Sequence, residues 1–255
     1  MVSKNSDKFV LNEPIRLLSV IVAAYNERET ISIALHGLHN VLNELGIASE
    51  IIVVESNSTD GTREIVRHLQ SQLDLKVFYQ ENPEGKGSAV RKGLEEISGD
   101  VFLIYDADNE YDPSDIPRLL APISNGKTSF VLGTRHEAGR PMRIMQDHMI
   151  RPFLMNAAHR FFTFLINSFF HVKLTDPFTM YKVFRVEVFH DVDLISNRFD
   201  LDWELVAKAI RRGAYPLEVP VSYNSRSFTE GKKVRFLRDP MNWLVALIRF
   251  RICKM

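Results

Sequence analysis

The sequence predicts an α/β protein with a doubly wound, mostly parallel sheet flanked by helices. In the first 135 residues, short runs of aliphatic and β-branched residues alternate with stretches in which apolar residues recur at helical spacing. Runs without polar alternation are typical of strands buried on both faces, and alternating strands and helices are typical of a parallel sheet. The composition, with 45% hydrophobic and 25% charged residues, excludes a disordered or collagen-like chain.

The first half of the chain supplies most of the expected sheet. Strands are expected over residues 17–23, 51–54, 76–79, 101–105 and 130–133. Helices are expected between them, over residues 30–45, 62–73 and 88–97 and from Pro113 onward. Gly46 follows the first of these helices as a stop signal, and Asp112 before Pro113 is typical of an N-cap.

The second half has a less regular pattern. Helices are expected over about residues 147–170, over 203–212 with Gly213 as the stop, and from Asp239 onward. A strand is expected over residues 181–185 and an edge strand over 219–223. We therefore expect a polar N-terminal arm over residues 1–14 and a single domain over 15–255, with halves at 15–135 and 136–255.

The two halves carry opposite charge, although the chain as a whole is neutral with 32 Lys/Arg and 32 Asp/Glu. Residues 136–255 hold 19 Lys/Arg and 12 Asp/Glu, a net of +7, and residues 1–135 hold 13 and 20, a net of −7. Neutrality argues against a nucleic-acid partner for the whole protein. The division predicts two sites with different tasks.

The sequence gives three expectations about location. The polar first 14 residues predict no signal peptide, and the single cysteine, Cys253, excludes an intramolecular disulfide and fits a reducing compartment. The apolar stretch 153–172 is interrupted by polar residues, so it predicts an interfacial helix and no membrane span. Residues 226–255 add 8 Lys/Arg against 2 Asp/Glu. We expect a cytoplasmic protein bound peripherally to an anionic membrane, or helices packed on a partner subunit.

The clearest chemical motif is acidic. Asp106, Asp108 and Glu110 follow an apolar strand at alternate positions, so an extended segment would point all three the same way. Such carboxylates repel one another unless a cation lies between them. A hard divalent cation with oxygen ligands, Mg²⁺ or Mn²⁺, fits this set and would commonly bind a phosphate as well. Their place after a strand of an α/β sheet favours this hypothesis over solvated loop acids.

Other polar residues follow the expected strands or open a helix. Lys86 and Gly87 precede a helix like part of a phosphate cradle, although neither a dinucleotide fingerprint nor a Walker sequence is present. Glu55 ends the second strand and is placed to reach a ligand. Asp202 and Glu204 begin a helix, where acids also serve as partners of the helix dipole. In the basic half, Arg226 and Lys232 flank a Gly-containing loop and suit a phosphate.

In this order the motifs resemble family 2 glycosyltransferases of the GT-A fold, in the dolichol-phosphate mannose synthase-like, polyprenyl-phosphate glycosyltransferase branch, over about residues 17–250. The matching motifs are residues 23–27, 54–62, 85–87, 106–110, 133–135, 176–185 and 226–232. The chain departs from the family pattern at Ala23, where proline is usual, and at Glu55, Ser56 and Asn57. Glu110 stands where mannose synthases usually have glutamine.

The resemblance implies a metal-dependent, inverting transfer from a GDP- or UDP-sugar to a polyprenyl phosphate. It implies donor contacts at Ala23, Tyr25, Glu27, Glu55, Lys86, Gly87, Asp106, Ala107 and Asp108. It implies metal ligands at Asp106, Asp108 and Glu110. It implies catalytic roles for Asp108, Arg135, Asp202, Glu204, Arg226 and Lys232, with Arg135 facing the donor diphosphate.

Three alternatives remain open. A glycan or other hydroxyl acceptor would need Asp202 or Glu204 as a general base, whereas a lipid phosphate is already an anion. A nucleotidyltransferase is disfavoured because residues 23–29 contain no glycine. A non-catalytic nucleotide-sugar binding protein is disfavoured by the intact Asp106, Asp108 and Arg135. The sugar, the nucleobase and the presence of a homo-oligomer stay undetermined by the sequence.

Overall fold

A computed structural model describes residues 7–11, 13–136, 150–225 and 249–250. Arg226 and Lys232, with the loop that holds them, lie outside the described residues. So do residues 147–149 at the expected start of the long helix, and most of the helix expected from Asp239 onward.

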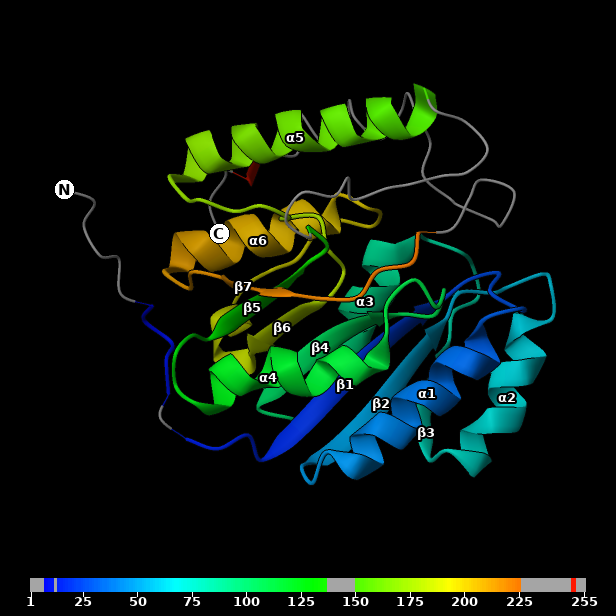
Figure 1. Ribbon diagram of the computed structural model, residues 1–255. Helices are drawn as coiled ribbons and strands as arrows, with labels where there is room; N and C mark the ends of the chain where they lie inside the picture. Colours follow the sequence, from blue (N-terminus) through cyan, green and yellow to red (C-terminus); the bar gives the residue numbers. More distant parts are fainter. Residues whose placement is uncertain (1–6, 12, 137–149, 226–248, 251–255) are drawn as a thin grey trace.

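Seven strands form one sheet in the order β3-β2-β1-β4-β6-β5-β7 (Figure 1). The strands are β1 (Leu17–Ala24), β2 (Ala48–Glu55), β3 (Leu75–Tyr79), β4 (Val101–Asp106), β5 (Phe130–Thr134), β6 (Lys182–Arg185) and β7 (Leu217–Pro220). The helices are α1 (Ile31–Glu44), α2 (Thr62–Gln72), α3 (Lys86–Glu95), α4 (Ile116–Ser124), α5 (Ile150–Phe170) and α6 (Leu201–Arg212). Two short 3₁₀ helices are η1 (Pro113–Asp115) and η2 (Val186–Phe189).

The expected doubly wound, mostly parallel sheet is confirmed. β1 pairs in parallel with β2 and with β4, β2 pairs in parallel with β3, and β5 pairs in parallel with β7. β6 is antiparallel to both of its neighbours, β4 and β5. It reaches this place from a distant part of the chain, after α5, so local sequence gives no sign of its direction.

The helices lie on both faces of the sheet because the chain reverses its direction of travel after β3. α1 connects β1 to β2, while α3 connects β3 back to β4, and right-handed crossovers in opposite directions place these helices on opposite faces (Figure 1). Gly93 lets α3 approach β1 closely, since a Cβ there would lie 2.5 Å from Ile21 Cγ2. The core between these layers consists of fully buried aliphatic and aromatic side chains.

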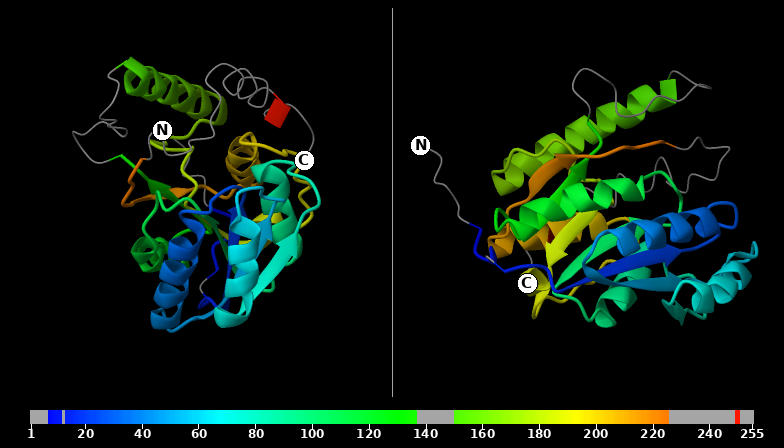
Figure 2. Two further views of the ribbon diagram at one scale, coloured as in Figure 1. Left: turned by 90° about the vertical axis from the view of Figure 1, so that its right-hand side faces the viewer. Right: turned by 60° about the horizontal axis from the view of Figure 1, so that its bottom comes forward.

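α5 forms an outer layer that packs on α6 (Figures 1 and 2). Its contact with α6 is more extensive than its contact with any strand of the sheet. The contact includes the Phe162 and Trp203 rings, whose centroids lie 5.4 Å apart at 83°. The opposite side of α5 leaves Phe153, Phe161 and Phe164 exposed by 70%, 55% and 65%. The expected amphipathic helix is therefore present, with aromatic side chains on its outward face.

Several element boundaries differ from expectation. α3 begins at Lys86, two residues before the expected Ser88, and β2 begins at Ala48, three residues before the expected start at 51. The edge strand β7 ends at Pro220, although residues to Tyr223 had been expected to continue it, and α6 begins at Leu201 rather than Trp203. Gly213 ends α6 in the left-handed region, φ 97°, as expected.

The described part of the N-terminal arm packs against the domain. The Asp7 carboxylate accepts hydrogen bonds from Ser129 N at 2.8 Å and from the Ser129 and Thr128 hydroxyls. Lys8 N donates to Gly213 O at 3.2 Å. The arm thereby fastens the start of β5 to the end of α6.

Candidate active site

The strand register brings the predicted acidic residues to one edge of the sheet. Asp106 at the end of β4 is level with Ala23 of β1, and the next residue of β1, Ala24, is level with Glu55 of β2. These are the carboxyl ends of three adjacent parallel strands, which is where open α/β sheets bind ligands. Ala107 is buried directly after β4.

The segment after β4 is a turn, which corrects the expectation of three carboxylates on one side of an extended chain. Asn109 has φ 61°, and Glu110 N donates to Asp108 Oδ1 at 3.0 Å, so the backbone reverses after Ala107. The Glu110 carboxylate accepts a hydrogen bond from the Tyr223 hydroxyl at 2.7 Å. Among the described residues, no group of three His, Cys, Asp or Glu side chains is placed to hold a metal ion.

Lys86 pairs with Asp106 at this edge. Its ammonium donates to Asp106 Oδ1. Burial alone would lower the pKa of Lys86, but the nearby carboxylates of Asp106, Asp202 and Asp108 together raise that pKa above its usual value. The Lys86 ammonium thus lies in acidic surroundings, with Asp106 as its direct ion-pair partner. Carboxylate oxygens of Asp106 and Asp108 are suitable ligands for Mg²⁺ or Mn²⁺.

The Gly85–Gly87 segment does not form the open phosphate cradle that was expected. Ser88 N, in the first turn of α3, donates to Asn197 O at 3.1 Å. A Cβ on Gly87 would lie 2.5 Å from Ser196 O, so this glycine is required for the close approach of that loop. The start of α3 is therefore partly closed by protein, and it presents the Lys86 side chain to the acidic edge.

The β1 and β2 ends form the other side of the edge. Tyr25 is 36% exposed. Glu55 was expected to reach a ligand at this edge, but its side chain is fully buried. The Glu55 carboxylate accepts from Ser58 N at 2.7 Å and pairs with Arg63. Glu27 N donates to Thr62 Oγ1 at 2.9 Å, which joins the two strand ends. Glu55 thus supports the turn after β2, and Tyr25 is the more accessible of the predicted donor contacts here.

Asp202 meets the fully buried Lys182. The Lys182 ammonium donates to Asp202 Oδ1 at 2.9 Å and to Thr179 O. Burial lowers the pKa of Lys182, and the Asp202 carboxylate opposes that shift. The Asp202 carboxylate also helps to raise the pKa of Lys86, as the Asp106 carboxylate does. It is an ion-paired carboxylate with only 13% of its side chain exposed.

Glu204, two residues further into α6, has a different environment. Its carboxylate is fully buried and accepts from Ile195 N at 2.9 Å, from Ser196 N at 2.8 Å and from Lys208 Nζ at 2.6 Å. These partners occupy it within the protein. Glu204 therefore holds the loop before α6 in place. These contacts do not favour the general-base role that a hydroxyl acceptor would require of it.

Arg135 likewise differs from the expectation that it faces a diphosphate. Its Nε donates to Asp176 Oδ2 at 2.7 Å and one terminal nitrogen donates to Asp176 Oδ1 at 2.8 Å. Its guanidinium also lies over the Tyr223 ring, 5.0 Å from the centroid. His159 Nε2 lies 3.8 Å from Asp176 Oδ1. Arg135 is thus a buried cation held in a protein network, with 6% of its side chain exposed.

Two residues that form buried ion pairs in this region, Lys182 and Asp176, were not among the predicted site residues. Lys182 lies in an apolar strand segment, and a charged side chain there signals a buried partner, because an unpaired ammonium would be too costly to bury. Asp176 was noted as part of a matching motif and given no role. No local sequence pattern indicates its ion pair, because its partner Arg135 lies 41 residues away in the sequence.

The fold is that of GT-A glycosyltransferases. It resembles glucosyl-3-phosphoglycerate synthase from Mycobacterium tuberculosis, solved with phosphoglyceric acid, with a TM-score of 0.65 and 21% identity over 94% of this chain and 81% of that one. It also resembles mannosyl-3-phosphoglycerate synthase from Rubrobacter xylanophilus, with a TM-score of 0.64 and 18% identity over 92% and 72% of the two chains.

The chain belongs to glycosyl transferase family 2, whose family model matches residues 19–193. It is 31% identical to a dolichol-phosphate mannosyltransferase of Pyrococcus furiosus over 84% of this chain and 58% of that protein. It is also 31% identical to a dolichol-phosphate mannosyltransferase of Mycosarcoma maydis, over 80% and 68%. The chain thus spans little more than half of the archaeal relative. The predicted class of enzyme, a family 2 glycosyltransferase, is confirmed.

Proposed function

We propose that the protein transfers a sugar, with inversion, from a nucleoside-diphosphate sugar to a polyprenyl phosphate. The observation that carries the proposal is the Lys86–Asp106 ion pair at the carboxyl edge of the sheet, where Asp106 is level with the end of β1. Family membership supports the transferase class. The names of the two mannosyltransferase relatives support a lipid-phosphate acceptor.

The acidic edge suits the donor diphosphate when a divalent cation is bound. Asp106 and Asp108 would hold Mg²⁺ or Mn²⁺, and the cation would stabilise the charge that develops on the leaving diphosphate. Lys86 is the nearest protein cation and is placed to take a donor phosphate oxygen. Glu110 is already bonded to Tyr223, so we assign it to positioning the turn. Arg135 would orient this side of the site through Asp176 and Tyr223.

The state of the remaining acids favours an acceptor that is already an anion. A hydroxyl acceptor needs a carboxylate that can take its proton, and the two acids predicted for that task are engaged. Asp202 is held in an ion pair with the buried Lys182, and Glu204 is fully enclosed. A phosphate acceptor is a nucleophile without losing a proton at the enzyme. Arg226 and Lys232, outside the described residues, remain the predicted phosphate ligands.

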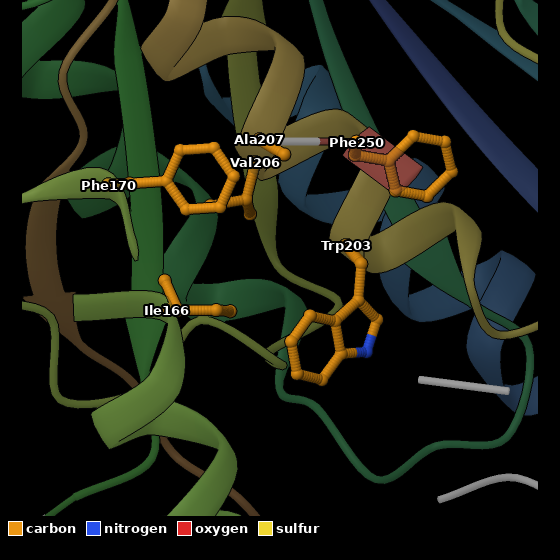
Figure 3. Close-up of a pocket in the computed structure, with 6 residues that line it drawn as sticks. All are labelled: Ile166, Phe170, Trp203, Val206, Ala207 and Phe250. Atoms are coloured by element: carbon orange, nitrogen blue, oxygen red, sulfur yellow. The ribbon is translucent and has the colours of Figure 1, made fainter. Parts of the chain in front are cut away.

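An apolar pocket near the start of α6 is closed and has no room for a water molecule, so it offers no ready site for the hydrocarbon part of such an acceptor. It lies between α5 and α6, and Figure 3 shows aromatic and aliphatic side chains pointing into it from both helices. The lining residues are Ile166, Phe170, Trp203, Val206, Ala207 and Phe250. Trp203 follows Asp202 directly in sequence, so the pocket and the ion pair share the start of α6.

The experiment is a donor and acceptor panel with the Asp202→Asn and Glu204→Gln variants. GDP-, UDP- and dTDP-sugars with Mg²⁺ or Mn²⁺ are first screened by thermal shift, since ligand at 100 times its Kd stabilises by about 2.7 kcal/mol. Transfer to a short polyprenyl phosphate is then measured. We expect Asp202→Asn to keep substantial activity. A loss of several orders of magnitude in Asp202→Asn, with folding unchanged, would show that transfer needs the Asp202 carboxylate and would contradict the proposed mechanism, and so would an absence of wild-type transfer to the polyprenyl phosphate.

We further propose that the protein acts at a membrane surface. None of the helices in the described ranges is long and apolar enough to cross a bilayer. The outward face of α5 presents Phe153, Phe161 and Phe164, which suit an interfacial position. Flotation with anionic vesicles at low and high salt tests this. We expect Phe161→Ser with Phe164→Ser to lose binding, and an absence of wild-type binding at low salt would refute the proposal.

A further inference from the structure

We propose that the loop Leu194–Arg198 is a positioning element that holds Lys86 against Asp106, and that Arg91 and Glu204 act on the site through this loop. The inference rests on the proposed function for its effect on donor binding. It assigns Glu204 a task at a distance from the chemistry, in place of proton transfer.

One side of the loop is fixed to α6. Glu204 accepts hydrogen bonds from two consecutive loop amides, Ile195 N and Ser196 N. The same carboxylate pairs with Lys208, whose ammonium also donates to Asp193 O. A buried carboxylate with amide and ammonium donors gives strong, directional bonds, so the loop cannot shift without breaking several of them.

The other side of the loop is fixed to α3. Arg91 donates to Leu194 O at 3.1 Å and to Asn197 Oδ1. Asn197 O accepts from Ser88 N, and Ser196 O and Asn197 O lie against Gly87 and Gly85 so closely that side chains at either glycine would collide with them. The loop therefore determines where the first turn of α3 lies.

Lys86 is the first residue of that turn. It lies between Gly85 and Gly87, the two residues against which the loop packs, and its side chain reaches Asp106 on β4. Neither glycine restricts the backbone by itself, since glycine is the most conformationally free residue. The loop supplies the restriction that the two glycines lack. Displacing the loop should thus release the Lys86 ammonium from the carboxylates while leaving the sheet intact.

The chain offers a matched pair of variants for the test. Arg91→Ala removes the α3 contact to the loop, whereas Lys92→Ala removes neighbouring exposed ion pairs to Glu95 and Glu96 on the same helix. Glu204→Gln and Gly87→Ala perturb the loop from its other contacts. All are compared with wild type for folding by circular dichroism and thermal unfolding.

The first measurement needs no donor. Hydrogen exchange followed by mass spectrometry reports how firmly the first turn of α3 is held, because Ser88 N in that turn donates to Asn197 O. Amides of this turn should exchange faster in Arg91→Ala than in wild type, and at the wild-type rate in Lys92→Ala. If the two variants exchange alike, the loop does not hold the start of α3 and the inference is wrong, whatever the enzyme's substrate.

The second measurement is calorimetric binding of GDP and UDP with Mn²⁺. Losing one or two hydrogen bonds that hold the loop should weaken binding about fivefold or more in Arg91→Ala, with Lys92→Ala unchanged. Equal affinities in Arg91→Ala and wild type would overturn the inference. If wild type binds neither nucleotide, the proposed function fails, and the hydrogen-exchange measurement still decides the positioning. Should Glu204→Gln fail to fold, Arg91→Ala and Gly87→Ala carry the comparison.

Discussion

Arg135 and Asp176 form a buried, two-pronged ion pair that joins the end of β5 to the segment before β6. Two guanidinium nitrogens meet the two carboxylate oxygens at 2.7 and 2.8 Å, and Arg135 N also donates to Asp176 Oδ2 at 3.0 Å. Asp176 N in turn donates to Glu218 on β7. The pair therefore connects the chain on both sides of the antiparallel strand, close to the candidate active site.

Breaking this pair should destabilise the protein strongly. Asp176→Asn leaves the Arg135 guanidinium buried without a counter-charge, and removing one partner of a buried pair costs about 3–5 kcal/mol. Denaturant unfolding at pH 7 measures the loss. Glu95→Gln, which removes an exposed partner of Lys92, is the control and should unfold like wild type. A small loss in Asp176→Asn would show that the pair contributes little to stability.

The same pair predicts an acid dependence. Burial alone would raise the pKa of Asp176, but Arg135, with a contribution from His159, holds that pKa well below its usual range. The native state therefore favours the ionised carboxylate, and this stability is present above the unfolded pKa of about 3.9. It is lost progressively as pH falls below about 4 toward the lower native value. Unfolding free energies between pH 7 and pH 3 should fall less steeply in Asp176→Asn than in wild type.

Asp106 and Asp108 should be essential for transfer and for metal-dependent donor binding. Asp106→Asn or Asp108→Asn removes a carboxylate from the predicted cation site, and the loss of such electrostatic stabilisation costs about 10²–10³-fold in turnover. Calorimetric titration with Mn²⁺ and nucleoside diphosphate should show weaker binding. Asp112→Asn is the matched control, because asparagine also serves as a cap for Ser114 N. Wild-type turnover in both Asp106→Asn and Asp108→Asn would contradict the site.

The N-terminal arm should contribute measurably to stability. In Asp7→Asn, an amide NH₂ replaces one of two oxygens, of which one accepts from Ser129 N at 2.8 Å and the other from Phe9 N at 3.0 Å, so either orientation of the amide opposes a backbone N–H. A donor facing donors leaves them unsatisfied, at a cost of about 1–3 kcal/mol. Asp74→Asn, at an exposed position with φ 49° that asparagine tolerates well, is the control. Equal melting temperatures for the two variants would show that the arm is not a stabilising contact.

Much of the fold follows from local sequence. The apolar runs of β1, β2 and β4 lie where they were expected, within two or three residues, because strands buried on both faces need uninterrupted apolar side chains. Gly213 ends α6 because its left-handed backbone suits glycine. The placement of Asp106 at the carboxyl edge of the sheet also followed from sequence, since it depends only on the order of strands and helices.

The assignments that failed were those that depended on partners distant in sequence. Alternation placed Asp106, Asp108 and Glu110 on one side, but a turn at Asn109 and the Tyr223 hydroxyl decide where Glu110 lies. Glu204 was expected at a helix start, with a catalytic role. It is buried because the loop before α6 folds back over it.

The sequence by itself determined the layered α/β fold and the position of the acidic edge, because both depend on periodicity and strand order. Only the tertiary structure decided which charges at that edge are free and which are paired. Lys182 with Asp202, and Arg135 with Asp176, are joined across 20 and 41 residues of chain. A buried charge is tolerated only where the folded chain brings it a counter-charge, and local pattern carries no record of that partner.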